Sequence, residues 1–323
     1  LYFIKEKKTL LYFSAIRSNY FIIPKYFKSF YFNYRSLNLS KKDHIFYASC
    51  RRKDLALINF LSKIDKNHPH FHIRFDLAPK IKFKGVFYYL REIDHELKNN
   101  RISIYLWKNN FKSFLKNSLC KKSIYETNLM FSYNPNSNFN RKLKQKNLVI
   151  GFLGNARRAK GFQYLPQIIE LLEQKNYHFR YLIQFSKISN DLLDVKKKLY
   201  KLSKTNKRLK IVEKYTSNKE FVEHLKKIDI MPILHNTYIL NSTSETFYSC
   251  IPYQIPFVIP KGVIFLKNIN SSRSFEIADN INDIVNKIIL ISQKYEFYLK
   301  NAKKNSINFK KFIKNDPIIK NLN

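Results

Sequence analysis

The chain has 323 residues, of which 45% are hydrophobic, so it is long enough for two domains with packed cores. Its formal net charge of +37 favours anionic partners: phosphorylated substrates, anionic lipid surfaces or nucleic acid. Cys50, Cys120 and Cys250 lie far apart, which argues against a disulfide framework or a CxxC metal site and fits a reducing, cytoplasmic compartment. No run of 18 apolar residues occurs, so we expect no transmembrane helix.

The first half of the chain alternates between short apolar runs and amphipathic stretches. The expected elements are strands at residues 45–48, 71–75 and 102–105 and helices at residues 52–64, 87–97 and 109–119. A polar stretch at residues 134–147 is the best linker candidate. We therefore predict a first α/β domain at residues 1–140. Because the chain begins at Leu1, with Met130 and Met231 as its only methionines, we expect this domain to be incomplete.

The second half shows the same alternation more strongly. The expected strands lie at residues 148–153, 179–185, 209–212, 228–234 and 256–259, and the expected helices at residues 162–174, 191–202, 219–227, 244–253, 281–294 and 295–312. Strands that alternate with helices are typical of a parallel, doubly wound sheet. Residues 141–323 are therefore predicted to form a second α/β domain that ends in helices.

Three of the five glycines of the chain fall in one short segment, LVIGFLGNARRAKG. Gly154 and Gly161 follow a buried strand, where glycine permits a positive φ and close approach of a ligand. We expect the next helix to point its free N–H groups at this turn, and Arg157, Arg158 and Lys160 add donors that match phosphate oxygens. The segment is thus interpreted as a diphosphate site, and a plain turn with solvated basic residues is the alternative. Neither a Walker loop nor a GxGxxG fingerprint is present.

A second helix start follows the strand expected at residues 228–234. The loop after that strand carries Tyr238, and Thr243 and Ser244 precede the next helix. Hydroxyl groups there can cap the helix, whose N-terminus offers a second anion site. Glu245 lies in the first turn, where it either binds sugar or ribose hydroxyls or only complements the helix dipole.

These two segments, GFLGNARRAKGF and P…Y…STSE…IPYQIPFVIP, together resemble the donor-binding domain of GT-B glycosyltransferases, nearest the retaining family-four type (glycosyl transferases group 1). The resemblance covers about residues 147–290, and residues 43–133 look like the end of the family's acceptor-side domain. It implies a fold of two Rossmann-like domains, of which residues 1–140 form the acceptor-side domain and residues 141–323 the nucleotide-sugar donor domain.

The resemblance also implies roles for individual residues. In the family the turn carries an Arg and then Lys-Gly, and the Arg and Lys hold the donor diphosphate. Lys160 and Gly161 match this pattern, and either Arg157 or Arg158 can serve as the Arg. Arg157 and Lys160 are the expected catalytic residues, because they would neutralise the leaving diphosphate. The expected donor-binding residues are Gly154, Asn155, Arg158, Gly161, Tyr238, Thr243, Ser244 and Glu245.

The second segment departs from the family in two places. The family carries two carboxylates seven residues apart and then a Gly and a Pro before the next strand. Pro256 matches the Pro, but Gln254 stands at the Gly position and Ser249 at or near the second carboxylate, with Glu245 out of register. A catalytically degenerate relative that binds a nucleotide or glycan is therefore the alternative to an active enzyme.

The resemblance implies a nucleotide-diphosphate sugar as donor, a glycan or lipid-linked acceptor of the cell envelope, and no cofactor or metal. His68, His70 and His72 form the motif HPHFH, and alternation would put them on one face of a strand. No carboxylate or Cys accompanies them at ligand spacing, so we favour a strand entry with exposed histidines over a metal site.

The excess positive charge leaves a third alternative, a protein that binds nucleic acid or a membrane surface by charge alone. No helix-turn-helix, RRM signature or zinc finger is found, so no nucleic acid is expected as a partner. The helix expected at residues 295–312 mixes phenylalanines with lysines. This mixture suits packing within the protein first and peripheral contact with an anionic membrane surface second.

Overall fold

The computed structural model describes residues 9–12, 44–47, 58, 60–62, 68–75, 101–107, 124–127, 139–144, 146–235, 244–261 and 273–322. The chain divides into two compact units, Leu1–Leu129 together with Ile313–Asn323, and Met130–Phe312. The domain boundary predicted near residue 140 lies inside the second of these units, and the last eleven residues belong to the first. The helices expected at residues 87–97 and 109–119 lie outside the described residues.

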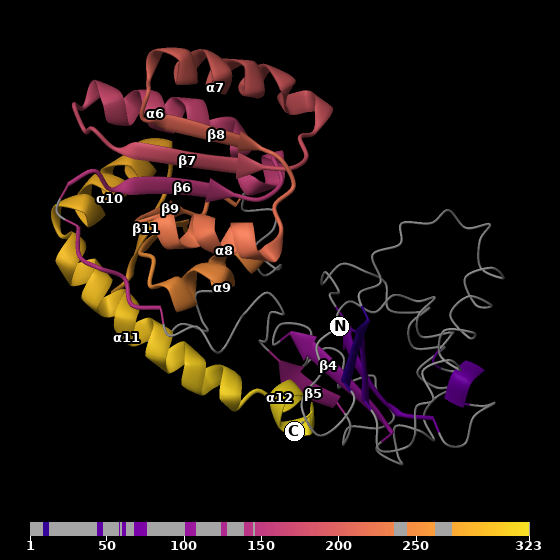
Figure 1. Cartoon of the computed structure of the whole chain (residues 1–323). Coiled ribbons are helices and arrows are strands. Elements are labelled where there is room, and N and C mark those ends of the chain that lie inside the picture. The colour runs from indigo at the N-terminus through magenta and orange to yellow at the C-terminus, as the bar shows by residue number, and fades with distance from the viewer. Residues whose placement is uncertain are drawn as a thin grey trace. The chain divides into compact units, whose positions relative to one another are not determined.

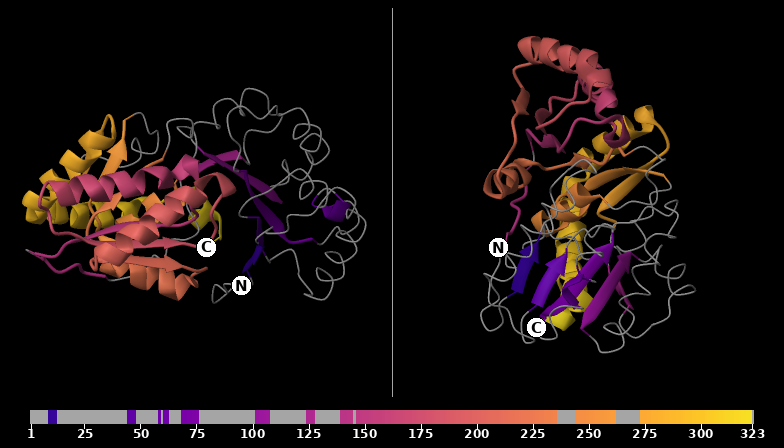
Figure 2. Two further views of the ribbon diagram at one scale, coloured as in Figure 1. Left: turned by 90° about the horizontal axis from the view of Figure 1, so that it is seen from above. Right: turned by 90° about the vertical axis from the view of Figure 1, so that its right-hand side faces the viewer.

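The first unit contains a sheet of parallel strands that follow one another in chain order (Figure 2, right-hand view). The strands are β1 (Thr9–Tyr12), β2 (His44–Tyr47), β3 (His70–Phe75), β4 (Ile102–Trp107) and β5 (Ile124–Thr127). Consecutive residues of β3 and β4 are buried, as expected for a parallel sheet covered on both faces. The three middle strands agree with the prediction, whereas β1 and β5 were not predicted.

Residues 313–323 also belong to this first unit. Helix α11 (Tyr295–Lys314) leads out of the second unit, and α12 (Pro317–Leu322) packs on β5. Thr127 Oγ1 donates to the carboxylate of Asp316 at 2.9 and 3.0 Å, and Asn321 Nδ2 donates to the hydroxyl of Tyr105 at 3.1 Å. Residues from both ends of the sequence therefore form one unit.

The second unit contains two three-stranded sheets that a parallel bridge between Ile150 and Ile230 joins. The strands are β6 (Val149–Leu153), β7 (Arg180–Phe185), β8 (Leu209–Glu213), β9 (Met231–Pro232), β10 (Phe257–Pro260) and β11 (Phe275–Ala278). Their spatial order is β8-β7-β6-β9-β10-β11, and all are parallel (Figure 1). This is the doubly wound order in which the direction of winding reverses between the first and fourth strands. The predicted fold class is confirmed.

Helices alternate with these strands. They are α6 (Leu165–Gln174), α7 (Leu193–Thr205), α8 (Asn218–Lys227), α9 (Glu245–Cys250) and α10 (Ile281–Gln293). α6 and α10 pack on each other and bury apolar stripes, and Ser217 with Glu220 forms a capping box at the start of α8. Of the helices that the structure describes, none is both long and apolar enough to cross a bilayer.

The strand expected at residues 228–234 is shorter than predicted. Only Met231–Pro232 is paired as β9, although every residue of that run is buried. A Cβ added at Gly151 would overlap the side chain of Ile228. Gly151 therefore serves the close packing of β6 against this run, and its presence in the glycine-rich segment is explained without a ligand.

A buried ion pair anchors the polar stretch at residues 139–144 to the second unit. Arg141 and Asp229 are 2% and 0% exposed, and Arg141 Nη1 donates to Asp229 Oδ1 at 3.2 Å. Arg141 also donates to the backbone carbonyls of Leu225, Lys226 and Tyr253. Asp229 Oδ2 accepts from the backbone N–H of Val149 at 2.9 Å. Both charges are thus fully hydrogen-bonded, as a buried pair requires.

Candidate functional site

The glycine-rich turn lies at the point where the winding of the second sheet reverses. In open α/β sheets, ligands bind outside the carboxyl ends of the strands at this point. β6 ends at Leu153, and Gly154 follows it with φ 122°. Gly161 has φ 73°, and a Cβ there would overlap the carbonyl oxygen of Leu234, which comes just after β9. The fold therefore brings the turn against the segment that leaves the neighbouring strand.

The turn is built from two 3₁₀ turns rather than from the start of a regular α-helix. Residues Arg158–Lys160 and Phe162–Tyr164 form these turns, and α6 begins only at Leu165. The N–H groups of Lys160 and Gly161 donate within the turn, and that of Gly154 donates to the carbonyl of Gln184 at 3.1 Å. The N–H group of Gly161, at the expected helix start, is therefore not free.

Lys160 supplies a positive charge directly above Gly154. The ammonium nitrogen lies 3.1 Å from the position that a Cβ of Gly154 would occupy, and Thr246 Oγ1 lies 3.8 Å from it. Thr246 in turn donates to the carbonyl of Leu153 at 3.4 Å and so ties the first turn of α9 to the end of β6. Because Gly154 has no side chain, the half-buried ammonium can occupy the space over the turn.

His235 stands beside this lysine, in the segment that follows β9. Burial and the nearby Lys160 ammonium lower the pKa of the half-buried His235 to about 4. The imidazole is therefore neutral at pH 7, and the positive charge in this corner comes from Lys160. Neither His235 nor Thr246 is among the predicted site residues, although the position of His235 just after a predicted strand was a usable signal.

The two arginines of the turn differ in their surroundings. Arg158 Nε donates to Asp191 Oδ2 at 2.5 Å, and both side chains are at least half exposed. Hydrogen bonds from Ser189 and Arg158 lower the pKa of Asp191, which keeps its carboxylate charged. Arg157 is also exposed, and within the described part of the chain no carboxylate is paired with it. Arg157 is therefore the arginine whose charge is not already neutralised.

The remaining predicted site residues are placed only in part. Asn155 Oδ1 accepts from Ser186 Oγ at 2.8 Å and ties the turn to the segment after β7. Ser244 is buried and caps α9, because its Oγ accepts from the N–H of Phe247 at 3.2 Å, as the sequence predicts. Tyr238, Thr243 and the side chain of Glu245 lie outside the described residues.

Ser249 and Gln254 are the two positions at which the sequence departs from the pattern of the resembling family. Ser249 is buried within α9, so no carboxylate is presented from that position. Gln254 has φ 56° and ψ 41°, the left-handed conformation for which glycine is favoured. Its side chain donates from Nε2 to the carbonyl of Phe139 at 2.7 Å and accepts the N–H of Arg141 at Oε1 at 2.9 Å. These bonds offset the strained backbone.

Replacing Gln254 by Ala is expected to destabilise the second unit by about 1–3 kcal/mol, because two hydrogen bonds are lost while the positive φ remains. Gln254→Gly loses the same bonds but relieves the backbone, so its effect should be smaller. Urea unfolding of the two variants beside the unchanged protein measures the difference. Equal losses of unfolding free energy in Gln254→Ala and Gln254→Gly would contradict the role given to the left-handed backbone.

Comparisons with known proteins place this fold. The sequence matches no family model, and no curated protein matches it. HepE from Anabaena in complex with UDP superposes with a TM-score of 0.60 at 10% identity, over 88% of this chain and 76% of that chain. Sucrose-phosphate synthase from Thermosynechococcus elongatus superposes with a TM-score of 0.59 at 10% identity, over 88% of this chain and 73% of that chain. A glycosyltransferase from Rickettsia africae superposes with a TM-score of 0.56 at 15% identity, over 91% of this chain and 79% of that chain.

All three of these neighbours are GT-B glycosyltransferases, and the chain shares their fold. The resemblance that the two sequence segments indicate is thus confirmed for the fold.

Proposed function

We propose that this GT-B chain transfers a sugar from a nucleotide-diphosphate donor to a glycan or lipid-linked acceptor. The observation that carries the proposal is the position of Lys160: its ammonium lies over Gly154 at the reversal point of the donor-side sheet. The structural neighbours are glycosyltransferases, and HepE was solved with UDP and with UDP-glucose. These likenesses support a nucleotide sugar as the donor.

In the proposed reaction, the bond between the sugar and the diphosphate breaks while an acceptor hydroxyl oxygen forms a new bond to the sugar, and the proton of that hydroxyl passes to the leaving diphosphate. Negative charge builds up on the leaving diphosphate, so stabilising that charge is the main catalytic demand. We assign this task to Lys160 and Arg157. The neutral imidazole of His235 can hydrogen-bond the donor without adding charge.

Several predicted residues fill supporting roles in this proposal. Gly154 and Gly161 shape the turn, and Asn155 and Ser244 hold it and α9 in place. Arg158 lies at its outer rim with Asp191, and we keep Tyr238, Thr243 and Glu245 as candidates for contact with the nucleotide or sugar. The two cationic side chains provide the charge for the diphosphate, so we propose no metal at the donor site and no cofactor.

We also propose that the enzyme works in the cytoplasm and touches an anionic membrane surface, where a lipid-linked acceptor would be found. The buried free thiol of Cys250 fits a reducing compartment. α7 presents exposed lysines beside the partly exposed Leu193 and Tyr200, a combination suited to an anionic lipid surface. These partners are inferred from charge and from the resemblance.

The test is turnover of a donor by the full chain. We expect release of the nucleoside diphosphate from at least one of UDP-, GDP- or ADP-linked sugars, measured by a coupled assay, and binding of the same nucleotide by calorimetry. Binding without turnover would support the degenerate, donor-binding alternative, for which the buried Ser249 is the motivating observation. The proposal is overturned if the chain neither binds nor turns over any of these donors.

A further inference from the structure

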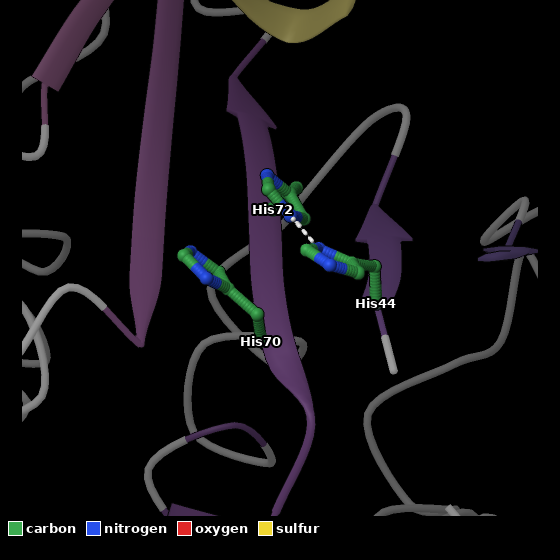
Figure 3. Close-up of side chains that lie close together, drawn as sticks. All are labelled: His44, His70 and His72. Atoms are coloured by element: carbon green, nitrogen blue, oxygen red, sulfur yellow. Dashed lines mark hydrogen bonds between the residues drawn. The ribbon is translucent and has the colours of Figure 1, made fainter. Parts of the chain in front are cut away.

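Three histidines of the first unit meet on one face of its sheet. His70 and His72 lie on β3, and His44 reaches toward His72 from the neighbouring strand β2 (Figure 3). One ring nitrogen of each lies within 4.8 Å of the others. Among the described residues, no other group of His, Cys, Asp and Glu side chains forms a comparable cluster.

The pairing of the strands explains this cluster. His44 is the register partner of His70 in the parallel pair of β2 and β3, so both side chains leave the sheet on the same face. His72 is two residues further along β3 and therefore points to that face as well. The expectation of exposed histidines at HPHFH is wrong, because His68 and His72 are buried and His70 is half-buried.

We propose that His44, His70 and His72 bind a divalent transition-metal ion of the Zn²⁺ type. Two histidines spaced by one residue on a strand, with a third on the adjacent strand, present three imidazole nitrogens, a ligand set that suits zinc. His44 Nδ1 and His72 Nε2 face each other at 2.7 Å. Ligands about 2.0–2.1 Å from one tetrahedral zinc ion lie about 3.3 Å apart, so small rotations of the rings admit the ion.

The second ring nitrogens of the two β3 histidines already have partners of the kind that orient metal ligands. His72 Nδ1 lies 2.8 Å from the hydroxyl of Tyr105, and His70 Nε2 lies 2.9 Å from Ser103 Oγ, both on β4. Such contacts fix which nitrogen faces the ion and hold the ring in place.

The position of the cluster separates the ion from the place where this kind of sheet binds its ligands. His44 and His70 are the first residues of β2 and β3, so the cluster lies toward the amino ends of the strands. Ligand clefts of open α/β sheets lie at the carboxyl ends. The ion would link β2 to β3 directly and to β4 through Ser103 and Tyr105. The inference is therefore independent of the proposed glycosyl transfer.

The test is metal binding by the full chain, prepared free of metal. We expect one Zn²⁺ per chain by calorimetry, and one Co²⁺ with the visible absorption bands of a tetrahedral site. Zn²⁺ should raise the Tm of the first unit, and a chelator should reverse that rise. His44→Ala and His70→Ala should each weaken binding at least about 100-fold, and Tyr105→Phe, which keeps the ring, about 10- to 100-fold.

The control is His178→Ala, which removes an exposed imidazole in the second unit and should leave the Zn²⁺ affinity within twofold. If the alanine variants fail to fold, the Co²⁺ spectrum of the unchanged chain and the Tyr105→Phe titration still decide the matter. The proposal fails if the unchanged chain binds no ion stoichiometrically, or if His178→Ala weakens binding as much as His44→Ala.

Discussion

Replacing Lys160 by Ala is expected to weaken UDP binding about 10- to 150-fold, because a charge-assisted hydrogen bond contributes about 1.5–3 kcal/mol. Turnover of the donor should fall by about 10²–10³, since the lost charge stabilises the leaving diphosphate more than the bound donor. Calorimetry with UDP gives the first quantity, and a diphosphate-release assay gives the second. The position of the ammonium over Gly154 is the structural reason for an effect of this size.

Lys175→Ala is the matched control for this experiment. Lys175 is an exposed lysine at the carboxyl end of α6, so its loss removes the same charge without touching the turn. The UDP affinity of Lys175→Ala should stay within twofold of that of the unchanged protein. Arg157→Ala should weaken binding more than Arg158→Ala, because Asp191 already neutralises Arg158. An unchanged affinity in Lys160→Ala would remove the role assigned to this residue.

Asp229→Ala is expected to cause the largest loss of stability, about 3–5 kcal/mol, because it leaves the guanidinium of Arg141 buried without its counter-charge. It also removes the acceptor for the N–H of Val149, at the first residue of β6. For a unit of this size the Tm should fall by about 10 °C or more. Scanning calorimetry of the full chain measures the transition of the second unit.

An ion pair on the surface provides the control for Asp229. Asp194 pairs with Lys197 at 3.5 Å on α7, and these side chains are 92% and 81% exposed. Asp194→Ala should shift the Tm by no more than about 1 °C, because water and salt screen such pairs. Equal shifts in the two variants would show that the buried pair contributes nothing beyond surface charge.

Local sequence patterns were sufficient for much of the second unit. The glycine-rich segment stands out in a chain with five glycines, and Gly154 and Gly161 do adopt positive φ. The match of Gln254 to the family's glycine position is also supported, because the backbone there has the left-handed conformation that glycine favours. These features depend on residues near one another in the chain, so their signals survive in the sequence.

Other features of the candidate sites depend on partners that are distant in sequence. Asp191 decides between Arg157 and Arg158, yet it lies 33 residues beyond Arg158. His44 joins His70 only through the register of two strands, and no local spacing reveals that register. Arg141 was assigned to a polar linker because its neighbours are polar, whereas its own side chain is buried against two distant segments, residues 225–229 and Tyr253.

The return of the chain into the first unit affects the order in which the protein can be made. The sheet of that unit is synthesised before the second unit, but Asp316 and Asn321, which bond Thr127 and Tyr105, are added after it. Domains generally fold as they emerge from the ribosome, amino-terminal first. Here the second unit can be finished while the first still lacks its final helix, so the unit begun first is the one completed last.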